Sequence, residues 1–266
     1  MIIVKSEREI ELMRRAGKIT AAARALAGEM VKPGVTTREI DKAVFHFIRS
    51  QGAEPSFLNY NGYPASVCVS VNDEIIHGIP GPRVLQEGDI VSVDVGAYYD
   101  GFHGDNAYTF AVGEVSAEAK ALLDATNESL YEAIKAVKPG ARLGDVSHAV
   151  QSYIEKRGYA IVRKYVGHGV GRNLHESPDV PNYGTAGHGI RLAAGMTLAI
   201  EPMVNAKGED VKVMKDGWTV KTVSGSLSAH FEHTIAVTEQ GAKILTIGEH
   251  RYADCGRLDC LLRCGT

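Results

Sequence analysis

A duplicated segment constrains the fold of this chain more than any other feature of its sequence. Residues 31–52 and 137–158 both open with Val-Lys-Pro-Gly and share four further identities, so that 8 of the 22 aligned positions are identical. Average composition predicts only about one or two identities over that length. A weaker match follows, in which residues 85–96 align with residues 192–203 and place Asp94 on Glu201. The chain is therefore predicted to consist of two related halves.

Each copy of the repeat has the pattern of an amphipathic helix. Ile40, Val44 and Ile48 recur at helical spacing and indicate one buried stripe. The predicted helix starts carry polar caps at Ser6, Thr36 and Ser116,. Because each helix pair is followed by β-type runs, we expect an α+β fold with central β-sheets and helices on the outer side.

Composition places the chain among ordinary globular proteins. Of its 266 residues 44% are apolar and 23% charged, and the net charge is −3, which favours neither a nucleic acid nor an anionic membrane as partner. There is no run of about 18 apolar residues and no pattern of a signal peptide, so we expect a cytoplasmic protein. Only Cys68 lies in the body of the chain, unlike the spread cysteines of a secreted disulfide framework.

Two carboxylates are predicted to lie side by side in the first half. Asp94 belongs to a β-type run, on the face opposite Val93,. Asp105 begins the next run, and the turn at Asp100-Gly101 suits a hairpin between them,. Taken alone, Asp94 is also compatible with a solvated residue of an edge strand. Two neighbouring carboxylates, however, repel each other unless a cation lies between them.

A further carboxylate of the second half lies on a run that matches this hairpin. Residues 233–237 resemble residues 108–112, and in that register Glu232 aligns with Ala107. Glu232 therefore falls two residues from the position of Asp105, on the same strand face. Both halves are predicted to supply one carboxylate from each of two equivalent strands.

The remaining candidate is a histidine among glycines. His168 lies in residues 167–171 (GHGVG), where the glycines allow the backbone to approach a ligand or another strand. A phosphate loop or a flexible turn is the alternative for this segment. The complete candidate set is Asp94, Asp105, His168, Glu201 and Glu232. This oxygen-rich set suits Mn²⁺, Fe²⁺ or Co²⁺, with Zn²⁺ as an alternative, and bridging carboxylates would hold two ions about 3.5–4 Å apart.

These residues and their surrounding motifs resemble the methionine aminopeptidases. The resemblance extends from about residue 6 to about residue 248, and its motifs are residues 60–68 (YNGYPASVC), 77–80 (HGIP), 92–96 (SVDVG), 167–171 and 231–234 (FEHT). It is closest to the short bacterial form, type I. The family's duplicated pita-bread fold implies a single catalytic domain over residues 1–248, with pseudo-symmetric halves 6–113 and 116–248 and a C-terminal extension 249–266.

The resemblance also implies a function and a set of site residues. The function is removal of the N-terminal methionine when the second residue is small, by attack of a metal-bridging water or hydroxide on the first peptide bond. The five candidates above match the metal ligands, with Asp105 and Glu232 bridging both ions and Glu201 also acting in catalysis. The residues that match substrate-contacting positions are His77, His175, Tyr60, Tyr63, Cys68 and Trp218. Asn72 and Ser228 match a monovalent cation site.

Several alternatives stay open at the level of the sequence. Without the motifs, His77 would be assigned a structural role, and Tyr60, Tyr63 and Cys68 would be assigned to core packing. Leu174 stands where the family often has an aromatic residue. Asn61 stands where some members have histidine, and the two departures leave the fit of the substrate open.

The rival functions are those of a proline-specific aminopeptidase or dipeptidase and of a binding protein without activity. Under the main hypothesis the partners are nascent polypeptide N-termini and, transiently, the ribosome, and the protein acts as a cytoplasmic monomer.

Overall fold

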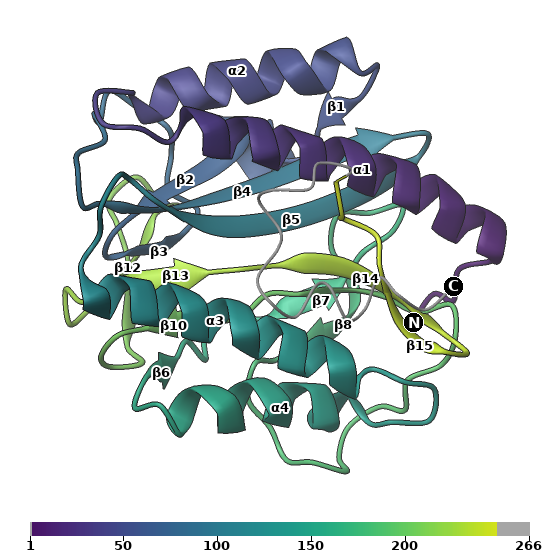
Figure 1. The fold of residues 1–266 in the computed structure, drawn as a ribbon. Helices are drawn as coiled ribbons and strands as arrows, with labels where there is room; N and C mark the ends of the chain where they lie inside the picture. The colour runs from purple at the N-terminus through teal and green to yellow at the C-terminus, as the bar shows by residue number, and fades with distance from the viewer. Residues whose placement is uncertain (1, 249–266) are drawn as a thin grey trace.

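The computed structural model describes residues 2–248, in which helices lie on both sides of a layer of strands (Figure 1). Helices α1 (Glu7–Met30) and α2 (Thr37–Ser50) cover the strands of the first half, and α3 (Ala117–Ala136) and α4 (Leu143–Glu155) cover those of the second. The predicted extension 249–266 lies outside the described residues.

The strands of the two halves are short apart from one long hairpin. The first half contains β1 (Glu54–Pro55), the 3-10 helix η1 (Tyr60–Gly62), β2 (Val67–Val71), β3 (Glu74–Ile76), β4 (Ile90–Tyr99) and β5 (Phe102–Ala111). The second contains β6 (Ala160–Ile161), β7 (Gly167–Gly169), β8 (Glu176–Val180), β9 (Thr197–Ile200), β10 (Met203–Asn205), β11 (Val211–Val213), β12 (Val220–Thr222), β13 (Ser228–His230), β14 (His233–Thr238) and β15 (Gly241–Ile244).

The helix starts predicted from the sequence are confirmed. Ser6 and Thr36 each accept a hydrogen bond from the backbone N–H of the third helical residue, and the glutamate side chain at that position accepts one from the N–H of the cap residue, which completes a capping box,. The Ser116 side chain caps α3 by accepting from the N–H of Ala119. The predicted stripe of α2 is fully buried at Ile40 and Val44, so the helices are held by caps at their ends and by apolar packing along one face.

The long hairpin also forms as predicted, and it rules out an exposed edge strand at Asp94. The turn between β4 and β5 has positive φ at Asp100 (50°) and Gly101 (85°), as a two-residue hairpin turn requires. Asp94 pairs with Cys68 of β2 on one side and with Ala107 of β5 on the other. The solvated edge-strand alternative is therefore wrong, because β4 has a hydrogen-bonded neighbour on each side.

Equivalent backbone contacts in the two halves confirm the duplication. The N–H of Gly34 donates to the carbonyl of Leu85 at 2.9 Å, and the N–H of Gly140 donates to the carbonyl of Leu192 at the same distance. Both contacts join the Pro-Gly turn of a repeat to the strand segment that aligns across the halves. The predicted α+β architecture of two pseudo-symmetric halves is thus present in the structure, with β5 and β14 side by side where the halves meet (Figure 1).

Two threonine hydroxyl groups join the halves across this junction. Thr234 Oγ1 accepts from the N–H of Asp105 at 3.0 Å and donates to its carbonyl at 2.8 Å. Thr109 Oγ1 makes the same two bonds to the backbone of His230, both at 2.8 Å. Since these hydroxyls satisfy backbone groups that no strand partner reaches, they hold the two inner strands in a defined register.

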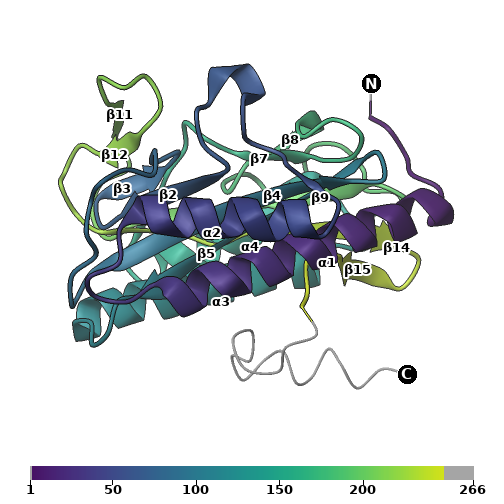
Figure 2. The same cartoon turned by 90° about the horizontal axis from the view of Figure 1, so that it is seen from above.

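The strands of residues 2–248 form four sheets between the two helical layers (Figure 1). The strand orders are β1-β4-β2 with β5 on β4, β13-β10-β6, β11-β12-β3 and β15-β14-β9-β7-β8. Seen from above, α1, α2 and α3 lie on one side, and β8 and the hairpin β11–β12 on the other (Figure 2).

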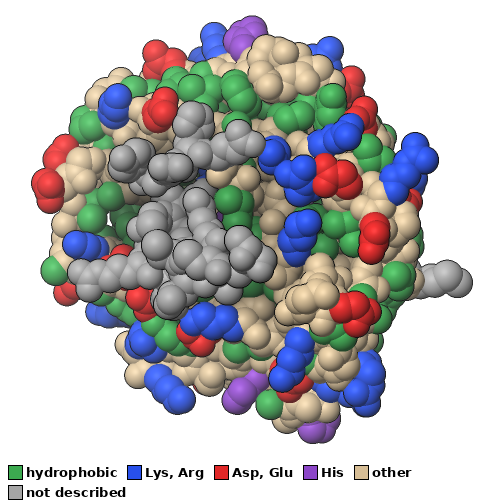
Figure 3. All heavy atoms as spheres, turned by 45° about the vertical axis from the view of Figure 1, so that its right-hand side comes forward, with side chains coloured by type: hydrophobic (Ala, Val, Ile, Leu, Met, Phe, Trp, Pro, Cys, Tyr) green, Lys and Arg blue, Asp and Glu red, His purple; other side chains and the backbone are tan. Residues whose placement is uncertain are grey.

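Surface charge and helix length add two observations. On the face that Figure 3 shows, Lys and Arg side chains are interspersed with Asp and Glu among the described residues.

None of the helices within residues 2–248 has the length and apolar character needed to cross a bilayer.

Helix α1 lies unusually close to β5 because two glycines face each other. A Cβ atom on Gly104 would lie 2.8 Å from Gly17 Cα and 2.9 Å from Thr20 Oγ1. Thr20 Oγ1 also bonds to the Gly104 carbonyl at 3.1 Å. Neither glycine has positive φ, so the requirement here is space rather than backbone conformation.

We predict that Gly104→Ala lowers the free energy of unfolding by about 1–3 kcal/mol, because the added methyl group must push α1 away from the sheet. Urea denaturation measures this loss. Gly81→Ala is the matched control, since its Cβ would meet nothing nearer than the Ile79 carbonyl at 3.9 Å. An unchanged stability of the Gly104 variant would contradict the close approach.

Candidate metal centre

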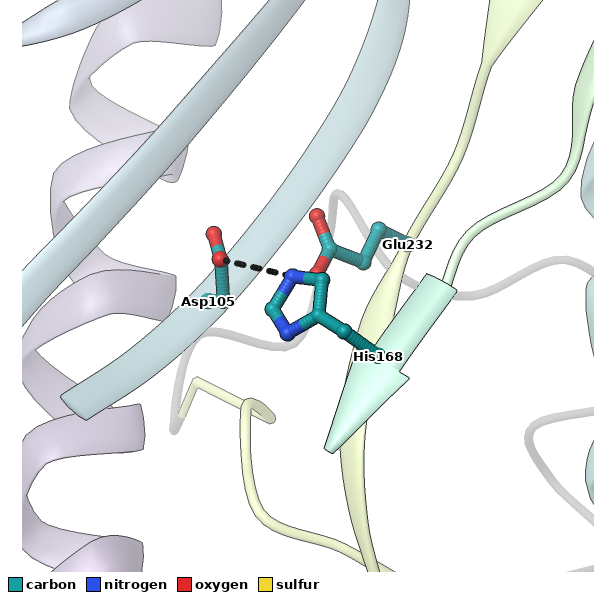
Figure 4. A group of neighbouring side chains, drawn as sticks. All are labelled: Asp105, His168 and Glu232. Atoms are coloured by element: carbon teal, nitrogen blue, oxygen red, sulfur yellow. Dashed lines mark ion pairs between the residues drawn. The ribbon is translucent and has the colours of Figure 1, made fainter. Parts of the chain in front are cut away.

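The five predicted metal ligands converge from separate elements of both halves. They are Asp94 in β4, Asp105 in β5, His168 in β7, Glu201 directly after β9 and Glu232 between β13 and β14. Figure 4 shows Asp105, His168 and Glu232 pointing toward one another from these elements. His168 lies in a strand, so the phosphate loop and the flexible turn are excluded as descriptions of its segment.

Distances within the group match those between ligands of a shared ion. One ligand atom each from Asp105, His168 and Glu232 lies within 4.8 Å of the others. His168 Nε2 is 3.7 Å from Asp105 Oδ2 and 3.5 Å from Glu201 Oε1. Asp105, His168 and Glu232 are 4%, 6% and 2% exposed, so water cannot screen their charges well.

The hydrogen bonding shows that this group suits a cation. Asp94 Oδ1, Asp105 Oδ1 and Glu232 Oε1 are buried and have no hydrogen-bond partner within residues 2–248. His168 Nδ1 lies 2.8 Å from the Gly169 carbonyl, which requires the proton on Nδ1 and leaves the lone pair of Nε2 facing the carboxylates. Acceptors that face acceptors in a buried site need a proton or a cation between them, and this set of carboxylates and one imidazole fits divalent metal ions.

Burial shifts the pKa values of the group toward neutral forms. Burial raises the pKa of Asp105 to about 7. Burial also raises the pKa values of Asp94, Glu201 and Glu232 above their usual range, and the charge of Asp105 raises them further. Burial lowers the pKa of His168 to about 3. A bound cation reverses this preference in the carboxylates, because its charge favours their ionised forms.

A largely apolar cavity of about 460 Å³ opens beside the carboxylates. Its lining residues are Phe57, Tyr60, Asn61, Tyr63, Cys68, Ile76, His77, Asp94, Asp105, Tyr165, Val166, His168, Leu174, His175, Glu201, Trp218 and Glu232. All the substrate-contacting residues predicted from the sequence therefore face one space. The alternative assignment to core packing is also correct in part for these residues. Tyr63 and Cys68 belong with Leu174 to a small apolar cluster that forms the wall of this cavity.

The two predicted substrate-contacting histidines occupy different walls of the cavity. His175 stacks on Tyr60 with ring centroids 5.3 Å apart, and its Nδ1 is 2.9 Å from the Tyr60 hydroxyl. His77 has φ of 58° and contacts the ring of Trp218 edge-on, with centroids 6.4 Å apart. Burial lowers the pKa of His77 to about 4, so the imidazole is neutral near pH 7.

Sequence reasoning missed several residues of this site. Phe57, Ile76 and Tyr165 line the cavity, but Phe57 and Tyr165 lie in irregular segments and Ile76 ends the three-residue strand β3, which is too short for a periodic pattern. His230 lies 3.6 Å from Glu201, and the register that aligned Glu232 with the first half contained the signal that could have found it.

The predicted monovalent cation site is not tested by the contacts. Asn72 and Ser228 do lie together, since the Ser228 N–H donates to the Asn72 carbonyl at 2.9 Å. That carbonyl is already engaged by an N–H group, and the cation stays a prediction.

The fold and the buried acidic centre define a class of metal-dependent peptidase. A sequence model of metallopeptidase family M24 matches residues 11–239. The chain belongs to metallopeptidase family M24.

Individual relatives are similar to the chain over most of its length. Methionine aminopeptidase 1 of Bacillus subtilis (strain 168) is 54% identical over 246 residues, which cover 92% of this chain and 99% of that protein. The crystal structure of methionine aminopeptidase from Thermotoga maritima matches with a TM-score of 0.91 at 51% identity, over 92% of this chain and 99% of that chain. The prolidase from Pyrococcus horikoshii OT3 matches with a TM-score of 0.76 at 27% identity, over 94% of this chain and 65% of that chain. The resemblance to methionine aminopeptidases and the duplicated pita-bread fold are thereby confirmed.

We predict that Glu232→Gln has opposite effects on stability with and without metal. In chelator-treated protein the change removes a buried charge that repels Asp105, so the melting temperature rises or stays the same. In the presence of Mn²⁺ at about 100 times its dissociation constant, wild-type protein gains about 2.7 kcal/mol of stability, and the variant gains clearly less. Differential scanning calorimetry with and without Mn²⁺ measures both effects.

Asp41→Asn is the control for this experiment. Asp41 is a partly buried carboxylate that accepts from the N–H groups of Ser66 and Val67 at 2.8 and 3.3 Å, away from the metal centre. Its variant should lose stability in both conditions and keep the full gain from Mn²⁺. An undiminished gain in the Glu232 variant would rule that residue out as a ligand.

Proposed function

We propose that this protein removes the N-terminal methionine from polypeptides whose second residue is small. The observation that carries the proposal is the apolar cavity that ends against the buried carboxylates. A methionine side chain is unbranched and apolar, and it suits a space walled by Tyr63, Cys68 and Leu174,. With the side chain there, the first peptide bond lies against the carboxylates.

The metal centre in this proposal consists of two divalent ions held by the five converging residues. The ligands are Asp94, Asp105, His168, Glu201 and Glu232, with Asp105 and Glu232 shared between the ions. Bound ions would acidify a water molecule and stabilise the charge that develops on the scissile carbonyl. The oxygen-rich ligand set favours Mn²⁺, Fe²⁺ or Co²⁺, with Zn²⁺ as an alternative.

Protein side chains complete the chemistry by moving protons and orienting the substrate. Glu201 is partly buried and lines the cavity; it takes the proton of the attacking water, then passes it to the leaving amine. His175 Nδ1 lies 2.9 Å from the Tyr60 hydroxyl, and in this proposal the hydroxyl is the donor, so that the imidazole has its proton on Nε2. That N–H donates to the carbonyl oxygen as it becomes negative. His77, which packs against Trp218, also lines the cavity and contacts the substrate there.

The proposal extends to the setting in which the enzyme works. Residues 1–248 constitute one catalytic domain that acts as a monomer in the cytoplasm on nascent chains, with transient contact to the ribosome. The similarity to Bacillus subtilis methionine aminopeptidase 1, over 92% of this chain, supports the choice of polypeptide N-termini as substrates. Light scattering on the purified protein checks the first part: a mass near 28.6 kDa indicates a monomer, and twice that mass would exclude it.

We predict metal-dependent release of methionine from Met-Ala-Ser. Met-Ile-Ser should be cleaved at least about 10-fold less efficiently, since a bulky second residue must be accommodated beside the centre. Ala-Ala-Ser should be a poor substrate because it leaves the apolar cavity empty. Metal-free protein reloaded with Mn²⁺, Fe²⁺, Co²⁺ or Zn²⁺ is assayed by chromatography of the released amino acid. A preference for Met-Pro-Gly would instead favour a proline-specific peptidase, and no turnover with any metal would favour a binding role.

The site assignment has its own test in Asp105→Asn. Loss of a residue that only orients a ligand costs about 10–100-fold in activity or affinity, so loss of a bridging carboxylate should lower kcat more than about 100-fold. Asp41→Asn, outside the centre, should keep wild-type turnover. Undiminished activity of the Asp105 variant would refute the proposed ligand set.

A further inference from the structure

His230 is a buried polar residue for which the proposed ligand set has no role. It ends β13, is 1% exposed, and neither ring nitrogen has a hydrogen-bond partner in the described part of the chain. Its Nε2 lies 3.6 Å from Glu201 Oε2, and among residues 2–248 no other carboxylate is within ion-pair distance of this ring. A buried N–H group requires an acceptor, and this carboxylate is the one available.

The duplication assigns His230 to the position that Asp105 holds in the first half. Thr234 Oγ1 bonds to both backbone groups of Asp105, and Thr109 Oγ1 bonds to both backbone groups of His230. The two pairs are related by the same offset, since 230 − 105 and 234 − 109 are both 125. The same register aligns residues 233–237 with residues 108–112. His230 is therefore the structural counterpart of a proposed metal ligand.

Each of the two equivalent residues lies beside a carboxylate of its own half. In the first half Asp105 pairs with Gly96 and Asp94 pairs with Ala107 on adjacent strands, and both carboxylates line the cavity. In the second half His230 is directed at Glu201, the residue that aligns with Asp94 in the sequence. The second half thus has an imidazole beside its carboxylate where the first half has a second carboxylate.

The hydrogen bonds of His168 and His230 indicate which imidazole can bind a metal through Nε2 and which can donate a proton from Nε2. His168 has its Nδ1 on the Gly169 carbonyl, so its Nε2 is unprotonated, and that atom faces both Asp105 and Glu201. His230 has no carbonyl at Nδ1. The proton of its neutral ring can therefore reside on Nε2, where it faces a carboxylate oxygen that can only accept.

We propose that His230 is a positioning residue for Glu201, donating its Nε2–H to Oε2 so that Oε1 stays directed at His168 and the metal centre. The two atoms are 3.6 Å apart in the structure, and the proposal requires this separation to shorten to hydrogen-bond distance in the working enzyme. The inference rests on the proposed function for the role of Glu201 in catalysis. Its structural part, that His230 orients a metal-binding carboxylate, is tested by metal affinity alone.

The test compares His230→Gln, which keeps an N–H donor, with His230→Leu, which removes it. Metal-free proteins are titrated with Mn²⁺ by calorimetry and assayed on Met-Ala-Ser. In the Leu variant we expect kcat to fall about 10–100-fold and Mn²⁺ affinity to weaken by about 10-fold, with KM little changed. The Gln variant should regain most of both quantities, and the number of bound ions should be the same in all three proteins.

Two controls keep the outcomes separable. Melting temperatures of the metal-free variants establish that each is folded, and His46→Leu, on the exposed face of α2, should leave turnover and affinity unchanged. Wild-type kcat and affinity in His230→Leu would overturn the inference. Loss of one bound ion in both His230 variants would also overturn it, because His230 would then be a ligand. Inactive wild-type protein that still shows the affinity pattern would refute the proposed function and leave the positioning role supported.

Discussion

The structure depends on the convergence of four carboxylates at the junction between its halves. Asp94, Asp105, Glu201 and Glu232 line one cavity, and an oxygen of each of Asp94, Asp105 and Glu232 is buried without a hydrogen-bond partner among residues 2–248. Such a group is costly in a folded protein unless cations neutralise it. Metal binding and the stability of the two-half arrangement are therefore linked, because each half supplies two of the four charges.

A duplicated scaffold supports a centre that is not itself symmetric. Three features are equivalent in the two halves: the Pro-Gly turns, the segments that these turns contact, and the threonine hydroxyls of Thr109 and Thr234 that bond to the backbone of the other half. The side chains directed at the junction differ, because Asp105 has His230 as its counterpart and Glu232 lies in the interruption between β13 and β14. One half can therefore orient a carboxylate with an imidazole while the other offers a second carboxylate. This difference gives Glu201 surroundings suited to proton transfer as well as to metal binding.

Sequence patterns predicted the parts of the site that depend on local geometry. The caps at Ser6, Thr36 and Ser116, the hairpin turn and the opposite faces of β4 follow from interactions within a few residues, and all of these are present. The full set of metal ligands, which lie in distant segments, was predicted from the resemblance to a known family and not from the spacing of the residues. Phe57 and Tyr165 were not predicted, because their place in the cavity wall depends on how loops from both halves pack.

The sequence by itself determined the duplication, the positions of the helices and which residue types carry the chemistry, because periodicity, caps and glycine turns act over short distances along the chain. Only the tertiary structure decided that Asp94 is central rather than at an edge, that Leu174 joins the wall of the cavity, and that His230 faces Glu201. Those outcomes depend on which segments become neighbours when the sheets form. The contacts join residues that are 13 to more than a hundred positions apart, as in Asp94 with Ala107, His230 with Glu201 and Leu174 with Cys68, and no local pattern encodes them.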